Sequence, residues 1–382
     1  MCARELPRVM VVMGTRPEAI KLAPVVRALR ESALFRTVVV AAGQHRELLS
    51  QVLEVFSLEP DYCLEAMVAG QSLGRLTGRL LASLEDVVAH ERPEAVLVQG
   101  DTTTALAGAL AAFYARIPVG HVEAGLRSGD RYAPFPEEIN RRLISQLASW
   151  HFAPTEGSRE ALLREGVPAA GIVVTGNTGI DALYQTLELL GEPQERAPGR
   201  LVLVTAHRRE SWGPPLEEVC LAVRDLLEAQ PDVVVCFPVH PNPAVREVAH
   251  ALLGGHPRAR LLAPLPYPSL CRLLAASHLV ITDSGGLQEE APALGKPVLV
   301  LRDVTERPEI VELGVAELVG TRRERILASA NRLLSDPAAY ARMARVVTPY
   351  GDGRASQRIL RFLAGRLVTP PSARYLSKEV TA

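Results

Sequence analysis

The sequence predicts an α/β fold made of two Rossmann-like domains that face a central cleft, each with a mainly parallel sheet. Short apolar runs alternate with amphipathic stretches of helical length from Arg8 onward, an order typical of parallel βαβ units. A polar segment bounded by glycine and proline, residues 191–199, interrupts this alternation, which then resumes. The 382 residues are enough for two domains on either side of such a linker.

The first domain is expected to span residues 1–190. Its predicted strands are the apolar runs Val9–Met13, Thr37–Ala41, Ala95–Gln99, Val119–Val122, His151–Ala153 and Ile172–Thr175. Its predicted helices lie between the strands, at Pro17–Arg30, Arg46–Phe56, Ser72–His90, Thr102–Tyr114, Glu137–Ser149 and Thr155–Glu165. Because such folds bind ligands beyond the carboxyl ends of their strands, functional residues are expected there.

The second domain is expected to span residues 200–352. Its predicted strands are Leu201–Thr205, Val233–Pro238, Arg260–Ala263, Leu279–Thr282 and Pro297–Leu301. A helix predicted over residues 353–367 follows the last of these elements and is expected to cross back to the first domain. Residues 368–382 are rich in proline, serine and charge and are expected to be frayed.

The composition argues against several classes of partner. A formal net charge of -1 gives no long-range attraction to nucleic acid or to an anionic membrane. No apolar run reaches the roughly 18 residues of a membrane span, and no signal-peptide pattern precedes the first strand, so a cytoplasmic location is expected. The five cysteines are scattered without CxxC spacing, which argues against a disulfide framework and against a zinc site.

The first predicted strand leads into a tight turn that opens a helix, residues 14–18. Backbone N–H groups at a helix start, with Arg16 and then Lys21 one turn later, suit a phosphate or diphosphate. The turn matches neither GxGxxG nor a P-loop, so it indicates neither NAD nor ATP. An ordinary strand-to-helix turn is the alternative interpretation, and Lys21 is one of only three lysines among 42 basic residues.

Three carboxylates follow predicted elements of the first domain. Asp101 ends one strand, Glu123 ends the next, and Glu137 begins a helix after a short loop. Taken singly, Asp101 is typical of a helix N-cap and Glu137 of a helix first turn. If the two strands are neighbours, the three acids share one rim, where mutual repulsion and burial raise at least one pKa toward working pH. Such a cluster suits general acid–base chemistry.

The second domain carries further candidates for binding an anion. His207 and Arg208 end its first strand, and Gly285 and Gly286 open a helix after its fourth, where the backbone can approach a diphosphate closely. His240 ends another strand and is equally consistent with a structural role.

Two more residues in this domain fit a nucleotide. Glu290, about one turn into the helix that Gly285 opens, is placed to accept hydrogen bonds from a ribose, and Arg307 follows the next strand. Together with the first-domain turn, these positions predict a nucleotide diphosphate across the cleft.

Seven motifs make the chain resemble a known family. They are GTRPEAIKLAP (Gly14–Pro24), GDTTT (Gly100–Thr104), HVEAGLRSGD with PEEINR (within His121–Arg142), TGNTGIDAL (Thr175–Leu183), AHRRE (Ala206–Glu210), TDSGGLQEEAP (Thr282–Pro292) and PYGDGRAS (Pro349–Ser356). In this order, over roughly residues 7–367, they closely resemble the non-hydrolysing UDP-N-acetylglucosamine 2-epimerases.

The resemblance implies a fold like that of GT-B glycosyltransferases and reversible conversion of UDP-N-acetylglucosamine (UDP-GlcNAc) into UDP-N-acetylmannosamine (UDP-ManNAc). It implies elimination of UDP to 2-acetamidoglucal and re-addition, with no redox cofactor and no metal. It further implies a homodimer and a supply of sugars for surface polysaccharide. The partners implied are therefore UDP-GlcNAc, UDP-ManNAc and UDP.

The resemblance also assigns residues. It places Asp101, Glu123, Glu137, His207 and Lys21 in catalysis, and leaves open which carboxylate serves which face of the sugar C2. It assigns UDP contacts to Arg16, Ser284, Gly285, Gly286, Glu290 and Arg307.

Several relatives also bind a second UDP-GlcNAc as an activator, and Gln44, Arg208 and His240 match positions used there. Glu47 and Gly70 stand where such relatives can carry glutamine and arginine, which argues against this regulation. Three other functions remain open: a glycosyltransferase, a hydrolysing epimerase, and a non-catalytic UDP-sugar sensor.

Overall fold

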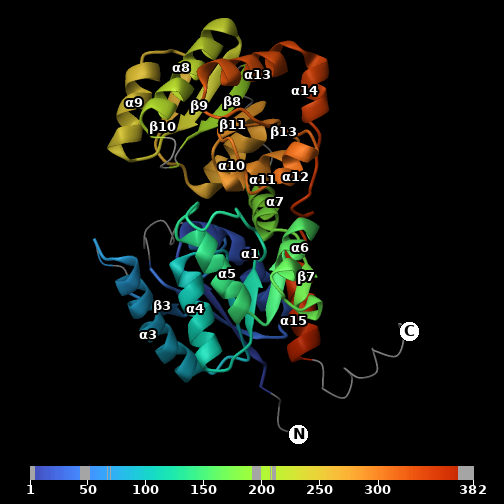
Figure 1. Ribbon diagram of the computed structural model, residues 1–382. Helices are drawn as coiled ribbons and strands as arrows, with labels where there is room; N and C mark the ends of the chain where they lie inside the picture. Colours follow the sequence, from blue (N-terminus) through green and yellow to red (C-terminus); the bar gives the residue numbers. More distant parts are fainter. Residues whose placement is uncertain are drawn as a thin grey trace. The chain divides into compact units, whose positions relative to one another are not determined.

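The computed structural model describes residues 5–43, 52–66, 68, 70–191, 199–206, 208 and 212–368. The chain forms two compact units (Figure 1). Unit 1 comprises the chain up to Gln185 together with the part from Tyr350 onward, and unit 2 is Thr186–Pro349. The expected linker 191–199 and tail 368–382 fall almost wholly outside the described residues.

The described part of unit 1 is built on a parallel sheet of seven strands in the order β3-β2-β1-β4-β5-β6-β7. The strands are β1 (Arg8–Met13), β2 (Arg36–Ala41), β3 (Tyr62–Cys63), β4 (Ala95–Gln99), β5 (Val119–Val122), β6 (Trp150–Ala153) and β7 (Ile172–Val174). The sequence does not predict β3, because a strand of two residues is too short to show a period.

Helices surround this sheet. They are α1 (Arg16–Ser32), α3 (Leu73–Glu91), α4 (Thr103–Tyr114), α5 (Glu137–Leu147), α6 (Glu156–Arg164), the 3-10 helix η1 (Ala169–Gly171), α7 (Thr178–Leu190), whose last residues belong to unit 2, and α15 (Ala355–Leu367). Most of the helix expected over Arg46–Phe56 lies outside the described residues. Helices α3, α4 and α5 cover the sheet face that Met10, Val12 and Val98 line. Helix α4 packs closely there, because a Cβ on Gly108 would lie 3.1 Å from Val98 Cγ1.

Unit 2 repeats the architecture with six parallel strands in the order β10-β9-β8-β11-β12-β13. The strands are β8 (Arg200–Thr205), β9 (Val233–Pro238), β10 (Ala259–Leu262), β11 (Leu279–Thr282), β12 (Val298–Val300) and β13 (Ala316–Leu318), the last one not predicted. The helices are α8 (Pro214–Ala229), α9 (Pro243–Leu253), α10 (Tyr267–Ala276), α11 (Gly285–Ala293), α12 (Pro308–Glu312), α13 (Arg323–Ser335) and α14 (Pro337–Met343).

The chain returns to unit 1 through α15, which packs against α1. The carboxylate of Asp181 on α7 is fully buried and caps this helix. It accepts hydrogen bonds from the backbone N–H of Ala355 at 3.1 Å and of Ser356 at 2.8 Å, and from Ser356 Oγ at 2.6 Å. One carboxylate therefore satisfies two of the otherwise unpaired backbone donors at the start of α15.

In each sheet the strand order reverses at one point, between β1 and β4 in unit 1 and between β8 and β11 in unit 2. Connections run in opposite directions from such a switch point, which opens a crevice outside the carboxyl ends of the two strands. The turns after β1, β4, β8 and β11 carry the motifs singled out in the sequence. Within the described residues, no helix is both long enough and apolar enough to cross a membrane.

Candidate active site

The turn between β1 and α1 is closed by a buried carboxylate. Glu18 forms a capping box with Thr15, and its Oε2 accepts the backbone N–H of Gly14 at 3.1 Å and of Thr15 at 2.7 Å. These N–H groups were expected to face an anion, but Glu18 already occupies them. An anion at this turn would therefore need donors other than these two N–H groups, and Arg16 lies half-buried at the first position of α1.

Glu18 also connects this turn to the one after β4. The hydroxyl of Thr102 donates to Glu18 Oε1 at 2.7 Å, across 84 residues of chain. The two turns touch so closely that a Cβ on Gly14 would lie 2.2 Å from Thr104 Oγ1. Burial, partly offset by these hydrogen bonds, raises the pKa of Glu18 to about 6.

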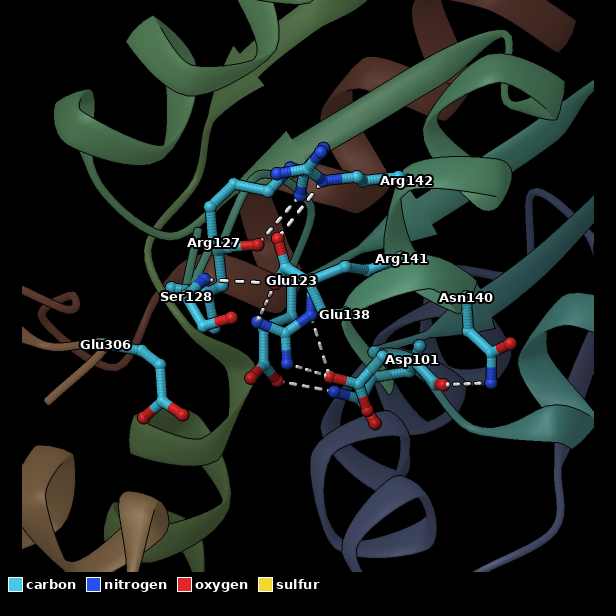
Figure 2. A network of polar contacts seen from close by, with 12 residues as sticks. Asp101, Glu123, Arg127, Ser128, Glu138, Asn140, Arg141, Arg142 and Glu306 are labelled. Carbon is cyan, nitrogen blue, oxygen red and sulfur yellow. Dashed lines mark hydrogen bonds and ion pairs between the residues drawn. The ribbon is translucent and has the colours of Figure 1, made fainter. Parts of the chain in front are cut away.

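Asp101 follows β4 and is held by α5. Its Oδ2 accepts hydrogen bonds from Nε of Arg141 at 3.1 Å and from Nη2 of the same guanidinium, while Asn140 Nδ2 donates to its backbone oxygen at 2.9 Å (Figure 2). The N-cap of α4 is Thr102, whose hydroxyl accepts the N–H of Ala105 at 3.0 Å. The alternative in which Asp101 is the helix cap is therefore wrong, and its carboxylate is one quarter exposed.

Glu123 follows β5, the strand next to β4, in a strained conformation. Its φ of +64° lies in the left-handed region that residues other than glycine rarely adopt. Its Oε2 accepts a hydrogen bond from Lys21 Nζ at 2.5 Å and another from Gln99 Nε2. The predicted pairing of adjacent strand ends is confirmed, because Gln99 of β4 lies opposite Val122 of β5.

The helix that Glu137 was expected to open does begin there, and Glu137 is half-buried. Its neighbour Glu138, which the sequence analysis did not single out, is fully buried. Glu138 accepts the N–H of Ser128 at 3.0 Å and Nε of Arg142 at 3.1 Å, and lies 3.4 Å from Nη1 of Arg141 (Figure 2). The spacing of three and four residues between this acid and the two arginines was the available signal.

A buried histidine supports the Asp101 turn. The ring of His121 on β5 is fully buried, and its Nε2 lies 2.7 Å from the carbonyl oxygen of Gly100. Burial lowers the pKa of His121 to about 3, so the ring is neutral and donates Nε2–H to that carbonyl. His121 thus fixes the left-handed Gly100, φ +69°, directly before Asp101.

In unit 2 the turns after β8 and β11 are joined by a carboxylate. Buried Asp283 accepts the N–H of Arg208 at 2.9 Å, and the hydroxyls of Thr205 and Thr282, the last residues of β8 and β11, lie 2.6 Å apart. Ser284 is the N-cap of α11, with its N–H bonded to Thr282 Oγ1 at 2.9 Å. These bonds fix the start of α11 beside the switch point.

Arg307 brings positive charge to the start of α11. A Cβ on Gly285 would lie 2.8 Å from Cζ of Arg307, so only glycine lets the guanidinium approach. Arg307 Nε donates to Glu289 at 2.7 Å, and Nη1 lies 3.4 Å from Glu306. Burial alone would raise the pKa of Glu306, but Arg307 and Arg302 outweigh it and lower the pKa to about 2.

The remaining predicted positions are placed as follows. Gly286 is the second residue of α11, and Glu290 is nearly buried with its Oε1 accepting the phenol of Tyr267 at 2.9 Å. His240 follows β9, with its ring centroid 6.1 Å from that of Trp212. His207 and Gln44, which the sequence also predicts as site residues, lie outside the described residues. Among the described residues, no three His, Cys, Asp or Glu side chains are grouped as metal ligands.

These features define a class of protein: an α/β protein of two units, each with a parallel sheet, in which carboxylates and cationic side chains lie in the turns beyond the carboxyl ends of the strands. The sequence model of the protein family described as UDP-N-acetylglucosamine 2-epimerase matches residues 27–364. The chain therefore belongs to the UDP-N-acetylglucosamine 2-epimerase family.

Comparisons with individual proteins of known name agree with this family assignment. The UDP-N-acetylglucosamine 2-epimerase of Escherichia coli K12 is 49% identical over 374 residues, which cover 95% of this chain and all of that protein. The crystal structure of UDP-GlcNAc 2-epimerase from Neisseria meningitidis bound to UDP-GlcNAc matches with a TM-score of 0.89 at 45% identity, covering 94% of this chain and 100% of that one. The Methanocaldococcus jannaschii enzyme in complex with UDP-GlcNAc and UDP matches at 0.80 and 34% identity, covering 94% and 99%. The predicted fold class is confirmed.

Proposed function

We propose that the protein interconverts UDP-GlcNAc and UDP-ManNAc without hydrolysis, by eliminating UDP to 2-acetamidoglucal and adding it back. The observation that carries this proposal is the pair of carboxylates at the ends of adjacent strands, each held by its own cation. Arg141 forms an ion pair with Asp101, and Lys21 forms one with Glu123. Such a pair can supply two proton-transfer groups to one sugar ring.

The chemistry requires more than one such group. The hydrogen at C2 has no adjacent carbonyl to acidify it, so loss of UDP from C1 must accompany its removal. Inversion then needs a proton from the opposite face of C2. We assign these transfers to Asp101, Glu123 and Glu137, with Lys21 and His207 stabilising the charge that develops, and leave the choice of face open.

The turns of unit 2 are assigned to UDP. The start of α11, with Ser284, Gly285, Gly286 and the adjacent Arg307, suits the diphosphate, and Glu290, held by Tyr267, suits the ribose hydroxyls. Arg16 of unit 1 is assigned to the same anion. Because solved relatives are described as bound to UDP-GlcNAc and UDP, these ligands are the first to test.

Incubation with UDP-GlcNAc in deuterated water, followed by NMR, tests the proposal. We expect deuterium at C2 of the sugar, formation of UDP-ManNAc, and no accumulation of free sugar. Free N-acetylmannosamine with UDP would identify a hydrolysing enzyme instead. Absence of exchange would leave a sensor or, if an acceptor consumed the sugar, a glycosyltransferase.

The Glu123→Gln variant tests the assignment of the carboxylate. A glutamine fits the same space but cannot transfer the proton, so turnover should fall by about a hundredfold or more. Normal turnover would remove Glu123 from the mechanism.

We further propose a homodimer and a product used for surface polysaccharide. For the second UDP-GlcNAc site that Gln44, Arg208 and His240 would form, Glu47 and Gly70 argue against activation. Initial rates from UDP-ManNAc should therefore be hyperbolic and unchanged when a little UDP-GlcNAc is added, and a rise in rate would show that the activator site works. Light scattering of the purified protein tests the dimer.

A further inference from the structure

We propose that Gln99 is a positioning residue for the reaction: together with Lys21 it fixes one oxygen of the Glu123 carboxylate and leaves the other oxygen to exchange a proton with the sugar. This inference rests on the function proposed above. It assigns a role to a strand residue that no sequence motif singled out.

Two side chains donate hydrogen bonds to the Glu123 carboxylate. Lys21 comes from the second turn of α1 and Gln99 is the last residue of β4, yet both donate to the same oxygen, Oε2 of Glu123. Gln99 is only 4% exposed, and the side chain of Glu123 is 8% exposed. Within the described residues, no donor contacts Oε1 of Glu123. The carboxylate is therefore held asymmetrically.

The backbone around Glu123 shows why a second donor is needed. At φ +64° the chain leaves β5 in the left-handed region, so the side chain is not directed by the regular pleat of the strand. Lys21 alone is a point charge on a flexible stem, which can follow a rotating carboxylate. The planar amide of Gln99, at a buried strand end, cannot follow a rotation of the Glu123 carboxylate. It therefore restricts the torsion of that carboxylate.

The position of Lys21 is itself constrained by packing. A Cβ on Gly179 of α7 would lie 3.6 Å from Cε of Lys21, so the lysine stem runs along the start of that helix. The ammonium supplies the positive charge that stabilises the carboxylate, and the neutral amide adds direction without a second charge. Oε2, which already accepts two hydrogen bonds, is a poor proton acceptor, whereas Oε1 keeps its lone pairs for a proton.

Two substitutions separate positioning from structure. Gln99→Leu keeps a side chain of comparable volume but has no donor. We expect kcat to fall by about 10- to 100-fold, because misplacing a reacting group by about 1 Å has an effect of this size. KM for UDP-GlcNAc should stay within a few-fold, and deuterium incorporation at C2 should fall in parallel with kcat. Gln99→His places an N–H donor at a similar reach and should recover most of the lost kcat.

Gln230→Leu is the matched control. Gln230 in unit 2 donates to Asn331 Oδ1 and to Ser335 Oγ, each at 3.1 Å, and it lies before the start of β9, at the edge of the parallel sheet opposite the strand ends that carry the motifs. Its loss should lower the thermal midpoint but leave kcat unchanged. If Gln99→Leu behaves in the same way, or if Gln99→His is no better than Gln99→Leu, the positioning role is overturned.

The outcome can be separated from that of the proposed function. An active wild-type enzyme with an equally active Gln99→Leu variant would overturn this inference alone. If the wild type is inactive, crystal structures still decide: a rotated Glu123 carboxylate in Gln99→Leu supports positioning, and an unmoved one excludes it.

Discussion

Two buried titratable side chains in unit 1, Glu18 and His121, have pKa values that burial shifts in opposite directions. The pKa of Glu18 rises from 4.5 to about 6, and that of His121 falls from 6.5 to about 3. Both groups are therefore more often neutral in the folded protein than in the unfolded chain. Neither enters the proposed proton transfers, but each holds one of the turns on which Asp101 depends.

The first prediction concerns Glu18→Gln. An acid whose folded pKa is raised contributes stability that is present below about pH 4.5 and is lost as the pH rises through about 6. Glutamine does not titrate and can still accept the N–H groups of Gly14 and Thr15. Relative to the variant, the wild type should therefore gain about 1 kcal/mol in unfolding free energy between pH 7 and pH 5.

This difference can be measured by urea unfolding in a Trp212→Phe background, where Trp150 is the remaining tryptophan and reports on unit 1. A difference between wild type and variant that is the same at both pH values would show that Glu18 is charged throughout this range.

The second prediction concerns His121→Gln. A histidine whose folded pKa is lowered stays neutral while the unfolded chain takes up a proton, so stability is lost as the pH falls from 6.5 toward 3. For His121 this amounts to about 2 kcal/mol at pH 5. The variant should lose less stability than the wild type over pH 7 to 5 in the same urea assay, and an identical loss would contradict a neutral His121.

At the scale of elements, helix α5 supports the candidate site because its Arg141 lies between two acids. Arg141 is nearly buried and contacts both Asp101 and the fully buried Glu138. The guanidinium fork can serve two carboxylates at once, which an ammonium cannot. Helix α5 thereby couples the 128–136 loop, through Glu138, to the candidate catalytic Asp101.

The third prediction follows from this fork. Arg141→Lys keeps the charge but loses the paired hydrogen bonds to Asp101, so kcat should fall by about tenfold or more while the protein remains folded. The control is Arg142→Lys, because Arg142 is 43% exposed and donates to Glu138 only through Nε. Equal kcat in the two variants, measured by UDP-ManNAc formation, would show that Asp101 does not depend on Arg141.

The helices and strands show which parts of the fold could be predicted from the sequence. Alternating apolar runs predicted both sheets, and strand ends correctly marked Asp101 and Glu123 as neighbours. Strand β3 has two residues, too few for a period to appear. Strand β13 is interrupted by Glu317, whereas the equally short β7 and β12 are wholly apolar and were predicted. The contacts of Glu18 with Thr102 and of Gln99 with Glu123 join residues 84 and 24 positions apart, and they depend on strand order and turn geometry that periodicity does not contain.

At the scale of the whole molecule, the chain leaves unit 1, forms unit 2 and returns through α15. The return is secured by Asp181 and by the ring of Phe362 on α15, whose centroid lies 5.8 Å from that of Trp150 and 5.5 Å from that of Phe152. Burial raises the pKa of Asp181, although the bonds from Ser356 and Ala355 oppose the shift. The stability of unit 1 therefore depends on a segment that follows unit 2 in the sequence.

The fourth prediction tests this dependence with Asp181→Asn. The amide can accept on one side only, so at least one N–H at the start of α15 is left buried and unpaired, which should lower the unfolding free energy of unit 1 by about 1–3 kcal/mol. The urea midpoint followed by the fluorescence of Trp150, which is next to α15, should fall. The midpoint followed by the fluorescence of Trp212 in unit 2 should stay unchanged. Asp352→Asn is the control, because Asp352 pairs with Arg358 at the surface and such pairs contribute less than about 1 kcal/mol. A parallel shift of both tryptophan signals in Asp181→Asn would instead show that the two units unfold as one cooperative body.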